Sequence, residues 1–418
     1  MSKVVKRRWT SEFSGPAKTD RRSCEYEAYL PDTLVGRSFS LDGRVAAEVA
    51  EAETAMACLN VEAASLVNTE ALARILLRAE AVASSRIEGL QIGARRLLQA
   101  EVARGLEEPS NDVTATEVLG NIDAMVLGID GVEVGGEISI DLLLEMHRRL
   151  LAGTYLDEHG GRFRDVQNWI GGSSYNPCSA AFVPPPPEYV ADLMADLVTF
   201  ANDDELPAVA QAAIAHAQFE TIHPFVDGNG RTGRALIHLI LRRRGAAVRV
   251  LPPVSLILAT WAKDYVNALT GVRYRGPSNS RAAHAGMNGW IEQFAVACKR
   301  AVADAAEFEK RSREIQDTWR ARLGAVRKNS ATDLLISALV GAPVVTVTSA
   351  AALIERSYPA VNNAITHLVT AGVLKQANLG RRNRAYEAPD IIAAFTDLER
   401  QLARPRARAG QIRPYAAR

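Results

Sequence analysis

Apolar residues recur at helical spacing over most of the chain. The clearest stripe lies between Thr69, a suitable N-cap, and Gly89, a suitable helix end. Its members fall on one face of a helix and are Leu72, Ile75, Leu76, Ala79 and Val82. The same spacing predicts further helices at roughly 43–67, 92–104, 113–128, 140–152, 188–202, 207–221, 229–244, 255–269 and 285–322. The pattern therefore predicts an all-α, mainly helical protein.

Two regions lack this spacing. Residues 1–40 show no sustained periodicity and are predicted to form an irregular arm. Residues 160–187 are rich in glycine and proline, with apolar residues between them, a pattern typical of a short hairpin or flap at about 165–185. The pattern leaves open whether this segment is an ordinary surface hairpin or a docking element.

The composition changes after about residue 325. Helices predicted at about 332–340, 348–355 and 360–371, a strand at 344–347 and a basic turn at 381–386 follow the order of a winged helix-turn-helix. From Lys375 onward the chain has ten basic and four acidic residues. The predicted division is an N-terminal helical region at 1–100, a core at 101–325, a winged helix-turn-helix at 326–395 and a basic tail at 396–418.

The composition is that of an ordinary soluble globular protein. Of the 418 residues, 48% are hydrophobic and 23% are charged, and the formal net charge is +1. This charge excludes a chain built as a polycation for nucleic acid or a membrane surface. No run of about 18 apolar residues and no signal peptide is found, so we expect no membrane partner.

The cysteines are scattered along the chain. None of the four has a neighbour at the spacing of a metal site: they are Cys24, Cys58, Cys178 and Cys298. This scatter predicts neither a zinc site nor a disulfide framework. It favours a reducing, cytoplasmic location.

The densest chemical signal runs from His223 to Arg234, with the sequence HPFVDGNGRTGR, between two predicted helices. Gly228 and Gly230 let backbone N–H groups approach an anion, and the helix that follows adds its N-terminal N–H groups and dipole. Arg231 and Arg234 are three residues apart, so they share a helix face and can bind one polyphosphate. The segment therefore predicts a phosphate-binding site.

Two residues of the same segment supply further chemistry. Asp227 offers a hard oxygen to Mg²⁺, and His223 can accept a proton near neutral pH. Taken singly, His223 is better explained as a structural histidine, Asp227 as a helix cap, Phe225 as a core residue and the arginines as surface charges. Their occurrence together, in the order that the chemistry requires, favours phosphoryl-type transfer.

This string matches the signature of the Fic family, HPFx(D/E)GNGRxxR, at every defined position, and the chain resembles that family. Residues 218–222 are similar to the usual lead-in, while 167–172 and 182–185 resemble the strands and base of the family's flap. Residues 29–31 and the predicted winged helix look like the flanks of long bacterial Fic proteins. The resemblance implies a mainly helical Fic fold with a short β-hairpin flap, followed by a C-terminal winged helix-turn-helix domain.

The resemblance also implies an activity, protein adenylyltransferase. Such an enzyme transfers AMP from ATP to a Tyr, Thr or Ser hydroxyl of a protein target, itself included, and releases pyrophosphate. By position, His223 would be the base, Asp227 would hold Mg²⁺, and Asn229 would contact the α-phosphate. Arg231 and Arg234 would hold the β- and γ-phosphates. The remaining nucleotide-binding residues implied by the motif are Phe225, Gly228 and Gly230.

A second family motif precedes the core. Residues 84–89, with the sequence SSRIEG, resemble the inhibitory motif (S/T)xxxE(G/N), and Ser84 and Glu88 are four residues apart on a helix predicted at about 70–89. A Glu88 carboxylate paired with Arg234 would take the cation meant for the γ-phosphate, so the resemblance implies autoinhibition. The alternative is a surface glutamate near a helix end. In some relatives the equivalent glutamate helps to remove AMP, so a reverse activity stays open.

The partners are less well determined. If the segment at 165–185 is a docking flap, it would pair with an extended target segment, and the residues expected there are Ser173, Ser174, Tyr175, Phe182 and Val183. The predicted recognition helix has no Lys or Arg, although its polar residues could contact DNA bases: Asn362, Asn363, Thr366 and His367. Homodimer formation or target docking is therefore favoured over DNA binding.

Two other function classes stay open. The same site could transfer another phosphate-containing group, such as UMP, phosphocholine or phosphate itself. Alternatively, the chain could be a DNA-binding regulator that uses a Fic body as a nucleotide sensor. The intact arginines argue against transfer of phosphate alone, and the presence of both His223 and Asp227 argues against a sensor that has lost catalysis.

Overall fold

The computed structural model describes residues 1–11, 17–64, 69–107, 112–379 and 383–401 of the 418-residue chain. Its fold is mainly helical, as predicted. The helices are α1 (Gly43–Ala64), α2 (Thr69–Ile87), α3 (Ala94–Gly105), α4 (Val113–Asp130), α5 (Ile140–Leu151), α6 (Val190–Ala201), α7 (Ala208–Ile222), α8 (Asn229–Arg243), α9 (Val254–Thr260), α10 (Ala262–Gly271), α11 (Arg281–Leu323), α12 (Ala331–Ala338), α13 (Val347–Ile354), α14 (Tyr358–Thr370) and α15 (Pro389–Gln401). The strands are β1 (Lys3–Trp9), β2 (Cys24–Leu30), β3 (Val344–Val345), β4 (Lys375–Leu379) and β5 (Asn383–Glu387). Among the described residues, no helix combines the length and apolarity that crossing a membrane requires.

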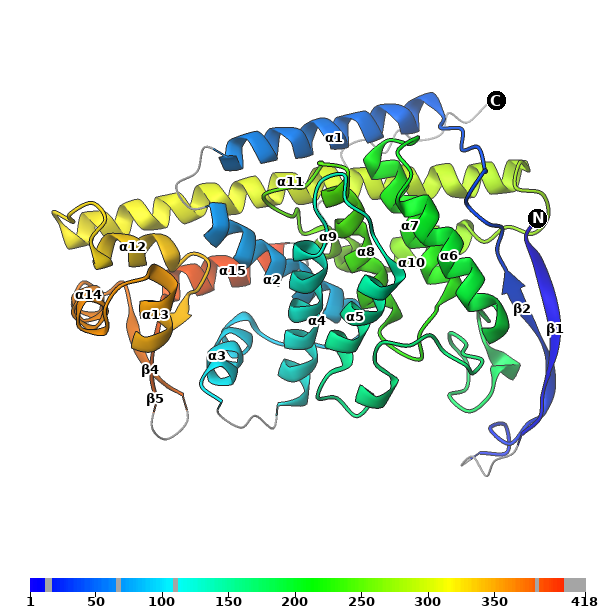
Figure 1. Ribbon diagram of the computed structural model, residues 1–418, viewed down its shortest axis with the longest axis horizontal. Coiled ribbons are helices and arrows are strands. Elements are labelled where there is room, and N and C mark those ends of the chain that lie inside the picture. The colour runs from blue at the N-terminus through cyan, green and yellow to red at the C-terminus, as the bar shows by residue number, and fades with distance from the viewer. Residues whose placement is uncertain (12–16, 65–68, 108–111, 380–382, 402–418) are drawn as a thin grey trace, which may run out of the picture.

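The helices surround a central pair, α7 and α8, which flank the HPFVDGNGRTGR segment (Figure 1). Two long helices, α1 and α11, run side by side along one face. The β1–β2 hairpin lies at one end of the molecule, and the elements from α12 to α15, here called the C-terminal unit, lie at the other.

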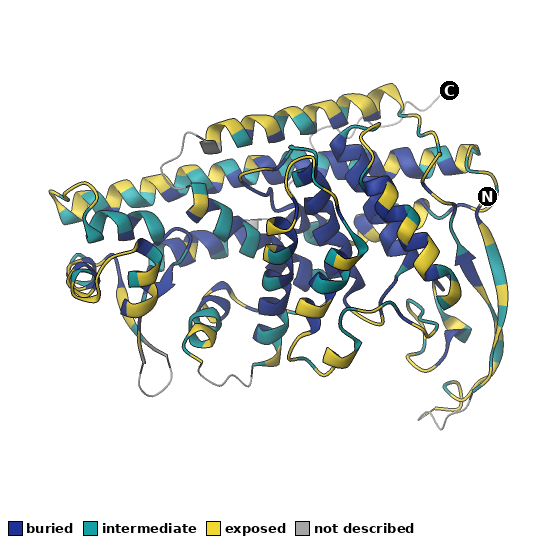
Figure 2. Cartoon of the chain, in the orientation of Figure 1, coloured by how far each residue is buried: buried dark blue, intermediate teal, exposed yellow. Residues whose placement is uncertain are grey.

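The central pair is densely packed. Every residue of α7 is buried, and its many alanines let neighbouring helices approach closely. Gly233 of α8 lies against Phe219 of α7, where an added Cβ would come within 2.8 Å of the ring. Figure 2 shows that buried residues concentrate around α7 and α8, whereas the outer face of α1 is exposed. The sequence motif is therefore held by the core of the fold.

Helix α2 docks on this core through buried polar contacts. Glu80, 1% exposed, pairs with His238 Nε2 of α8 at 2.9 Å and accepts a hydrogen bond from the backbone N–H of Ser255 on α9 at 2.7 Å. Asn121 of α4 donates to the Ser85 hydroxyl at 3.1 Å. Removing one partner of a buried polar contact leaves the other unsatisfied and typically costs about 1–3 kcal/mol. The register of α2 on α8 is therefore firmly set.

The expected irregular arm at 1–40 is wrong where the structure has strands, at Lys3–Trp9 and Cys24–Leu30. Strands β1 and β2 form an antiparallel hairpin in which Lys3 pairs with Leu30 and Trp9 with Cys24. Both strands carry many charged residues on their exposed faces, so the alternation shows little apolar contrast. The hairpin is fixed to the core where Ala28 and Tyr29 are buried, a tertiary effect that the local pattern does not report.

The C-terminal unit contains α12, β3, α13, α14, the β4–β5 hairpin and α15, with a sheet in the order β3-β5-β4. Helix α13 begins at Val347, not after Thr348, because Thr346 forms a capping box: its hydroxyl accepts from the Ser349 N–H at 3.0 Å. The strand expected at 344–347 is correspondingly short. Helix α15 was not predicted, and the helix expected at 255–269 is divided at Trp261 into α9 and α10.

Candidate active site

The segment between α7 and α8 makes two left-handed turns. His223, which ends α7, has φ 51°, and Gly228, which precedes α8, has φ 76°. Glycine adopts this conformation freely, whereas a residue with a side chain pays about 1–2 kcal/mol. Such strain at a histidine persists only where the surroundings impose it, as they often do at functional sites.

The loop between these turns is held by Asn229 and Phe225. The Asn229 carboxamide accepts from the Phe225 N–H at 2.8 Å and donates to the Phe225 carbonyl at 2.9 Å. Phe225 is fully buried and stacks on His147 of α5, with ring centroids 3.7 Å apart. Both side chains therefore shape the loop, and Phe225 lies in the core.

His147 of α5 also holds this loop, and the sequence did not indicate this role. Its Nδ1 accepts from the Gly161 N–H at 3.1 Å, so its Nε2 donates to the Asp227 carbonyl at 3.0 Å. Burial lowers the pKa of His147 to about 4, so the ring stays neutral and keeps this tautomer at physiological pH. The only sequence signal was its place on the apolar face of α5, which is also where a core histidine would lie.

An anion site opens at the N-terminus of α8. Arg231 is 4% exposed, and within the described part of the chain its Nε and Nη1 have no hydrogen-bond partner. Its nearest carboxylates, Glu117 and Asp227, are 3.7 Å away from its terminal nitrogens. A buried guanidinium with open donors, beside the free N–H groups of a helix start, is suited to bind a phosphate.

Asp227 lies at the rim of this site. Its side chain is 48% exposed, and Oδ1 accepts from the Gly228 N–H. The described residues include no group of three or more His, Cys, Asp or Glu side chains arranged around a metal. A single exposed carboxylate beside a phosphate site nevertheless fits Mg²⁺, which is commonly held by one or two carboxylates together with substrate phosphates.

The two predicted inhibitory residues meet Arg234 in the same place. Arg234 is 1% exposed; its Nε donates to the Ser84 hydroxyl and its Nη2 to the Ser84 carbonyl, both at 2.9 Å. Nη2 also donates to Glu88 Oε1 at 2.7 Å. The Glu88 oxygen sits directly over Gly230, where an added Cβ would come within 2.0 Å of it. The structure thus brings the carboxylate of the residue that follows α2 to the N-terminus of α8, where an anion would bind.

The electrostatics favour that contact. Burial by itself raises the pKa of Glu88, but the Arg234 guanidinium outweighs it, and the pKa lies below the ordinary value. Glu88 is therefore a carboxylate at neutral pH. Its side chain is still 38% exposed, so the pair lies at the edge of the core and not deep within it.

His223 is enclosed by a second residue that the sequence did not indicate, Arg164. Arg164 is 3% exposed, and its guanidinium donates to the carbonyls of His223 at 2.8 Å, Val166 at 3.0 Å and Pro185 at 2.6 Å. It ties the flap base to the histidine backbone. Burial, reinforced by this cation, lowers the pKa of His223 to about 4, so the ring is neutral and able to accept a proton.

The flap has less regular structure than a hairpin. Ile170 and Phe182 form an isolated bridge, with N–H to O distances of 2.8 and 3.1 Å, before Gly171 and Gly172 turn the chain. Alternate residues of a strand direct their backbone groups to opposite sides. The backbone N–H and C=O of Trp169 therefore face away from Phe182, and no hydrogen bond between described residues uses them.

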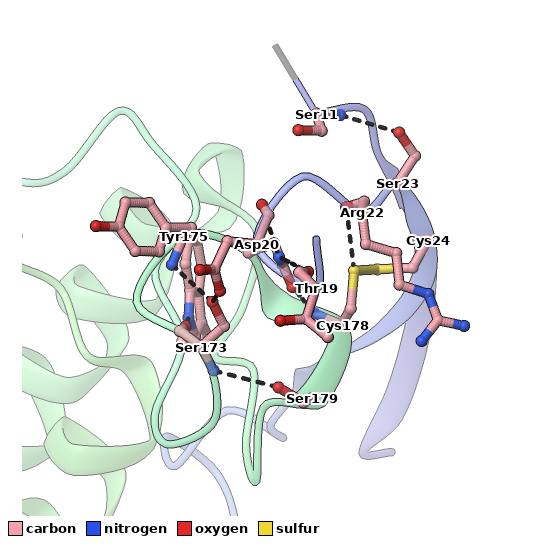
Figure 3. Close-up of a disulfide and its surroundings, with 12 residues drawn as sticks. Ser11, Thr19, Asp20, Arg22, Ser23, Cys24, Ser173, Tyr175, Cys178 and Ser179 are labelled. Atoms are coloured by element: carbon pink, nitrogen blue, oxygen red, sulfur yellow. Dashed lines mark hydrogen bonds between the residues drawn. A yellow bond between two sulfur atoms is a disulfide. The ribbon is translucent and has the colours of Figure 1, made fainter. Parts of the chain in front are cut away.

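A disulfide fastens the flap to the hairpin, contrary to the expectation that the cysteines stay unpaired. Cys24 of β2 is bonded to Cys178, and Ser173 donates to the Asp20 carboxylate at 2.8 Å (Figure 3). The two cysteines are 154 residues apart, which is why their spacing along the chain gave no sign of pairing. The cysteine argument for a reducing compartment no longer holds.

The predicted flap residues have different surroundings. Tyr175 is 48% exposed and Ser174 is exposed, whereas Ser173 holds the hairpin tip. Val183 is buried, and its carbonyl accepts from the Tyr29 N–H at 2.9 Å. Phe182 lies under the Arg273 guanidinium, 3.6 Å from the ring centroid. Ser174 and Tyr175 are thus open to a partner, while Val183 belongs to the support of the flap.

Comparisons with known proteins match both halves of this site. The model of the Fic/DOC family matches residues 137–241, and that of the Fic/DOC family N-terminal region matches residues 46–130. The first range contains the motif, and the second contains Ser84 and Glu88.

Two curated relatives and one solved structure show how far the similarity extends. Protein adenylyltransferase fic-1 of Caenorhabditis briggsae is 42% identical over 134 residues, which are 31% of this chain and 24% of that protein. Protein adenylyltransferase Fic of Drosophila grimshawi is 38% identical over 120 residues, 28% of this chain and 23% of that protein. The matched region is about a quarter of the length of these relatives. A crystal structure of a Fic family protein from Desulfovibrio desulfuricans G20 covers 84% of this chain and 97% of its own, with a TM-score of 0.52 and 21% identity, and so indicates a shared fold.

Proposed function

The chain belongs to the Fic family, and from this premise we propose that it is a protein adenylyltransferase, which transfers AMP from ATP to a Tyr, Thr or Ser hydroxyl of a protein. The observation that carries the proposal is Arg231, a buried guanidinium with open donors at the start of α8, in the same segment as a neutral His223. The curated relatives that match this region are named for the same activity.

The reaction follows from the positions of these groups. The target hydroxyl gives its proton to His223 as its oxygen forms a bond to the α-phosphorus. The bond between the α-phosphorus and the pyrophosphate oxygen breaks, and Arg231 and Arg234 stabilise the leaving charge. Mg²⁺, when bound with ATP, would offset charge on the phosphates, and Asp227 is the residue to hold it. Asn229 acts chiefly by shaping the loop whose N–H groups face the α-phosphate.

Glu88 would act as a brake on this reaction. The γ-phosphate and the Glu88 carboxylate compete for Arg234, and the carboxylate also covers Gly230. A nucleotide can then bind only in a pose without the Arg234 contact. The N-terminal helix α2 holds the brake in register through Glu80 and Ser84.

The flap would align the target. An extended target segment can donate to and accept from the backbone of Trp169, whose N–H and C=O point outward. Ser174 and Tyr175 are the exposed residues beside this edge that would meet target side chains. Because backbone pairing depends little on sequence, the flap would accept segments that differ in composition, including segments of a second copy of this chain.

For the C-terminal unit we propose a winged helix-turn-helix that docks a partner protein or a second copy. The order of α12 to α14 and the β4–β5 hairpin supports it, and α14 exposes four polar residues on one face: Asn362, Asn363, Thr366 and His367. With no Lys or Arg on α14, DNA is the less favoured partner. A gel-shift assay of the full chain would show salt-sensitive binding if this preference is wrong.

The activity is tested by incubating the chain, the Glu88→Gly variant and the Glu88→Gln variant with labelled ATP, UTP, GTP, CTP and CDP-choline in turn. Glu70→Gln, a change at an exposed residue of the same helix, is the control. We expect both Glu88 variants, but not the control, to modify themselves from ATP and to gain the mass of AMP. Incorporation from another donor only would replace AMP transfer with the corresponding group transfer. Equal labelling of the unaltered chain and the two Glu88 variants would remove Glu88 as the brake.

A further inference from the structure

Glu220 stands one turn before His223, in the last turn of α7, and the proposed mechanism gives it no role. The residue is 8% exposed, and its Oε2 lies 4.0 Å from His223 Nδ1. Within the described residues, neither His223 Nδ1 nor Glu220 Oε1 has a hydrogen-bond partner. Oε1 faces Gly233 of α8, where an added Cβ would come within 2.8 Å of it. The imidazole ring and the carboxyl group thus lie beside each other in the core, with Nδ1 and Oε2 too far apart to form a hydrogen bond while Oε1 faces Gly233.

This arrangement is costly for a resting structure. A buried polar group left without a partner costs about 1–3 kcal/mol. Here His223 Nδ1 and Glu220 Oε1 are both such groups, and they belong to side chains that approach each other to 4.0 Å. A buried polar group left unsatisfied in a native structure requires an explanation, and a role in catalysis is one.

The charges around the pair depend on the brake. The groups that act on the Glu220 carboxyl are Arg234 on α8, Glu88 beyond α2 and Arg273 beyond α10. Burial raises the pKa of Glu220 to about 7, with Glu88 adding to the rise and Arg234 opposing it. When Glu88 leaves, the pKa of Glu220 falls, so its charged form is favoured at neutral pH.

His223 needs such a partner to be an effective base. Burial and Arg164 lower the pKa of its ring to about 4, and Glu88 and the Glu220 backbone carbonyl oppose this only in part. A base so weak at neutral pH accepts a proton poorly in the transition state. A carboxylate at Nδ1 would raise its basicity and would also fix which nitrogen carries the proton.

We propose that Glu220 is the positioning residue of His223: its carboxylate accepts a hydrogen bond from Nδ1–H, so that Nε2 faces the target hydroxyl. The proton from the hydroxyl goes to Nε2, the Nδ1 proton stays on the ring, and Glu220 stabilises the imidazolium that results. The inference rests on the proposed function for the identity of the hydroxyl, but the contact itself does not depend on which group is transferred.

The experiment compares Glu220→Gln, Glu220→Asp and Glu220→Ala in a Glu88→Gly parent, so that the brake does not mask the effect. Glu399→Gln is the matched control, because Glu399 is also buried, with an oxygen that lacks a hydrogen-bond partner and a pKa raised by burial to about 7. Glu399 lies in α15 of the C-terminal unit, where its nearest cation is Arg86 at 3.8 Å, and the Glu88→Gly parent has already lost the brake that follows Arg86. Initial rates of AMP incorporation are measured from pH 5 to 9, with KM for ATP and with ATP binding by calorimetry.

We expect Glu220→Gln to lower kcat on the order of tenfold or more at neutral pH, with KM for ATP changed less than about twofold. The acid limb of the pH profile moves to lower pH, because the ring loses the carboxylate that raises its pKa. Glu220→Asp recovers part of kcat, and the control behaves as its parent. A Glu220→Gln variant with full kcat and an unmoved acid limb overturns the role. So does a variant that loses kcat and ATP affinity together with its thermal stability.

A second measurement does not require turnover. Nitrogen chemical shifts of the His223 ring, assigned by comparison with a His223→Gln sample, report its tautomer and its pKa. In the Glu88→Gly parent we expect Nδ1–H and a higher pKa than in the Glu220→Gln variant. Equal shifts in both would contradict the inference even if the parent transferred no AMP, whereas a parent that transfers nothing with the expected shifts would count against the proposed function alone.

Discussion

The brake at Arg234 and the flap fastening at Cys178 both join parts of the chain that are far apart in sequence, but in different surroundings. Arg234 is 1% exposed and donates three hydrogen bonds to α2 and the residue beyond it. Cys178 is only partly buried, and the flap residues around it contact the tip of the β1–β2 hairpin. The Arg234 side chain is therefore held by the core, with only its Glu88 partner at the core edge and 38% exposed, whereas the contacts of the flap lie near the surface and can open locally. The nucleotide site is thus fixed, while the brake carboxylate and the target surface can adjust.

We expect substitutions in the core to change catalysis or ATP binding, and substitutions in the flap to change neither. His223→Ala in the Glu88→Gly parent removes the base, so AMP incorporation falls by about 10²–10⁴-fold. ATP binding by calorimetry stays within about twofold, because the ring makes no contact with the phosphate site in this account. Retained turnover would show that another group takes the proton.

Arg231→Ala has the next largest effect. It removes a buried guanidinium whose open donors await a phosphate, and a charged hydrogen bond is worth about 1.5–3 kcal/mol. We expect the Kd for ATP to rise roughly 10- to 100-fold, measured by calorimetry in the Glu88→Gly parent. Arg149→Ala, an exposed arginine of α5 paired with Glu145, serves as the control. Unchanged affinity would mean that the nucleotide lies elsewhere.

The flap side of the comparison is tested at the disulfide. A cross-link that closes a long loop contributes about 2–4 kcal/mol to stability, so Cys24→Ser should lower the midpoint of denaturation in non-reducing buffer. Amide exchange at 173–179 should quicken while the Kd for ATP is unchanged. Cys58→Ser, at an exposed free cysteine, should change neither. Loss of ATP affinity in Cys24→Ser would show that the flap and the anion site at the start of α8 are coupled.

The smallest expected effect concerns pH. The pKa of Glu88 lies below its ordinary 4.5, so its pairing with Arg234 is fully present above that ordinary value and is lost as pH falls through the lowered one. Between pH 6 and 8 the pair therefore stays formed, so the ratio of activity in the Glu88→Gly variant to that in the unaltered chain should not fall toward pH 6. A ratio that shrinks steeply toward pH 6 would indicate that another titrating group controls the brake.

The two regions also differ in how far the sequence predicts them. The residues from His223 to Arg234 are contiguous, so their spacing alone predicts a phosphate-binding site. The helical stripe of α2 likewise predicts that Ser84 and Glu88 lie on one face. Arg164 and His147 gave no such signal, because their partners are backbone carbonyls and an N–H that only the tertiary fold brings near them.

The flap and its anchor were the hardest to predict. The β1–β2 hairpin alternates charged residues with few apolar ones, and its stability depends on contacts with Val183 and Cys178, more than 150 residues away. Local patterns report local preferences. The pairing of two segments so distant in sequence depends instead on the helices between them, whose packing no short window of the sequence contains.

If the anion site at the start of α8 directs attack to the α-phosphorus, the position of a label in ATP decides whether the protein becomes labelled. The Glu88→Gly variant is incubated in parallel with ATP labelled at the α-phosphate and ATP labelled at the γ-phosphate, with the His223→Ala, Glu88→Gly double variant as the blank. The account predicts that protein-bound label appears from the α-labelled ATP alone and that pyrophosphate is released in equal amount. Label retained from the γ-phosphate, or no label from either while ATP still binds, would contradict it.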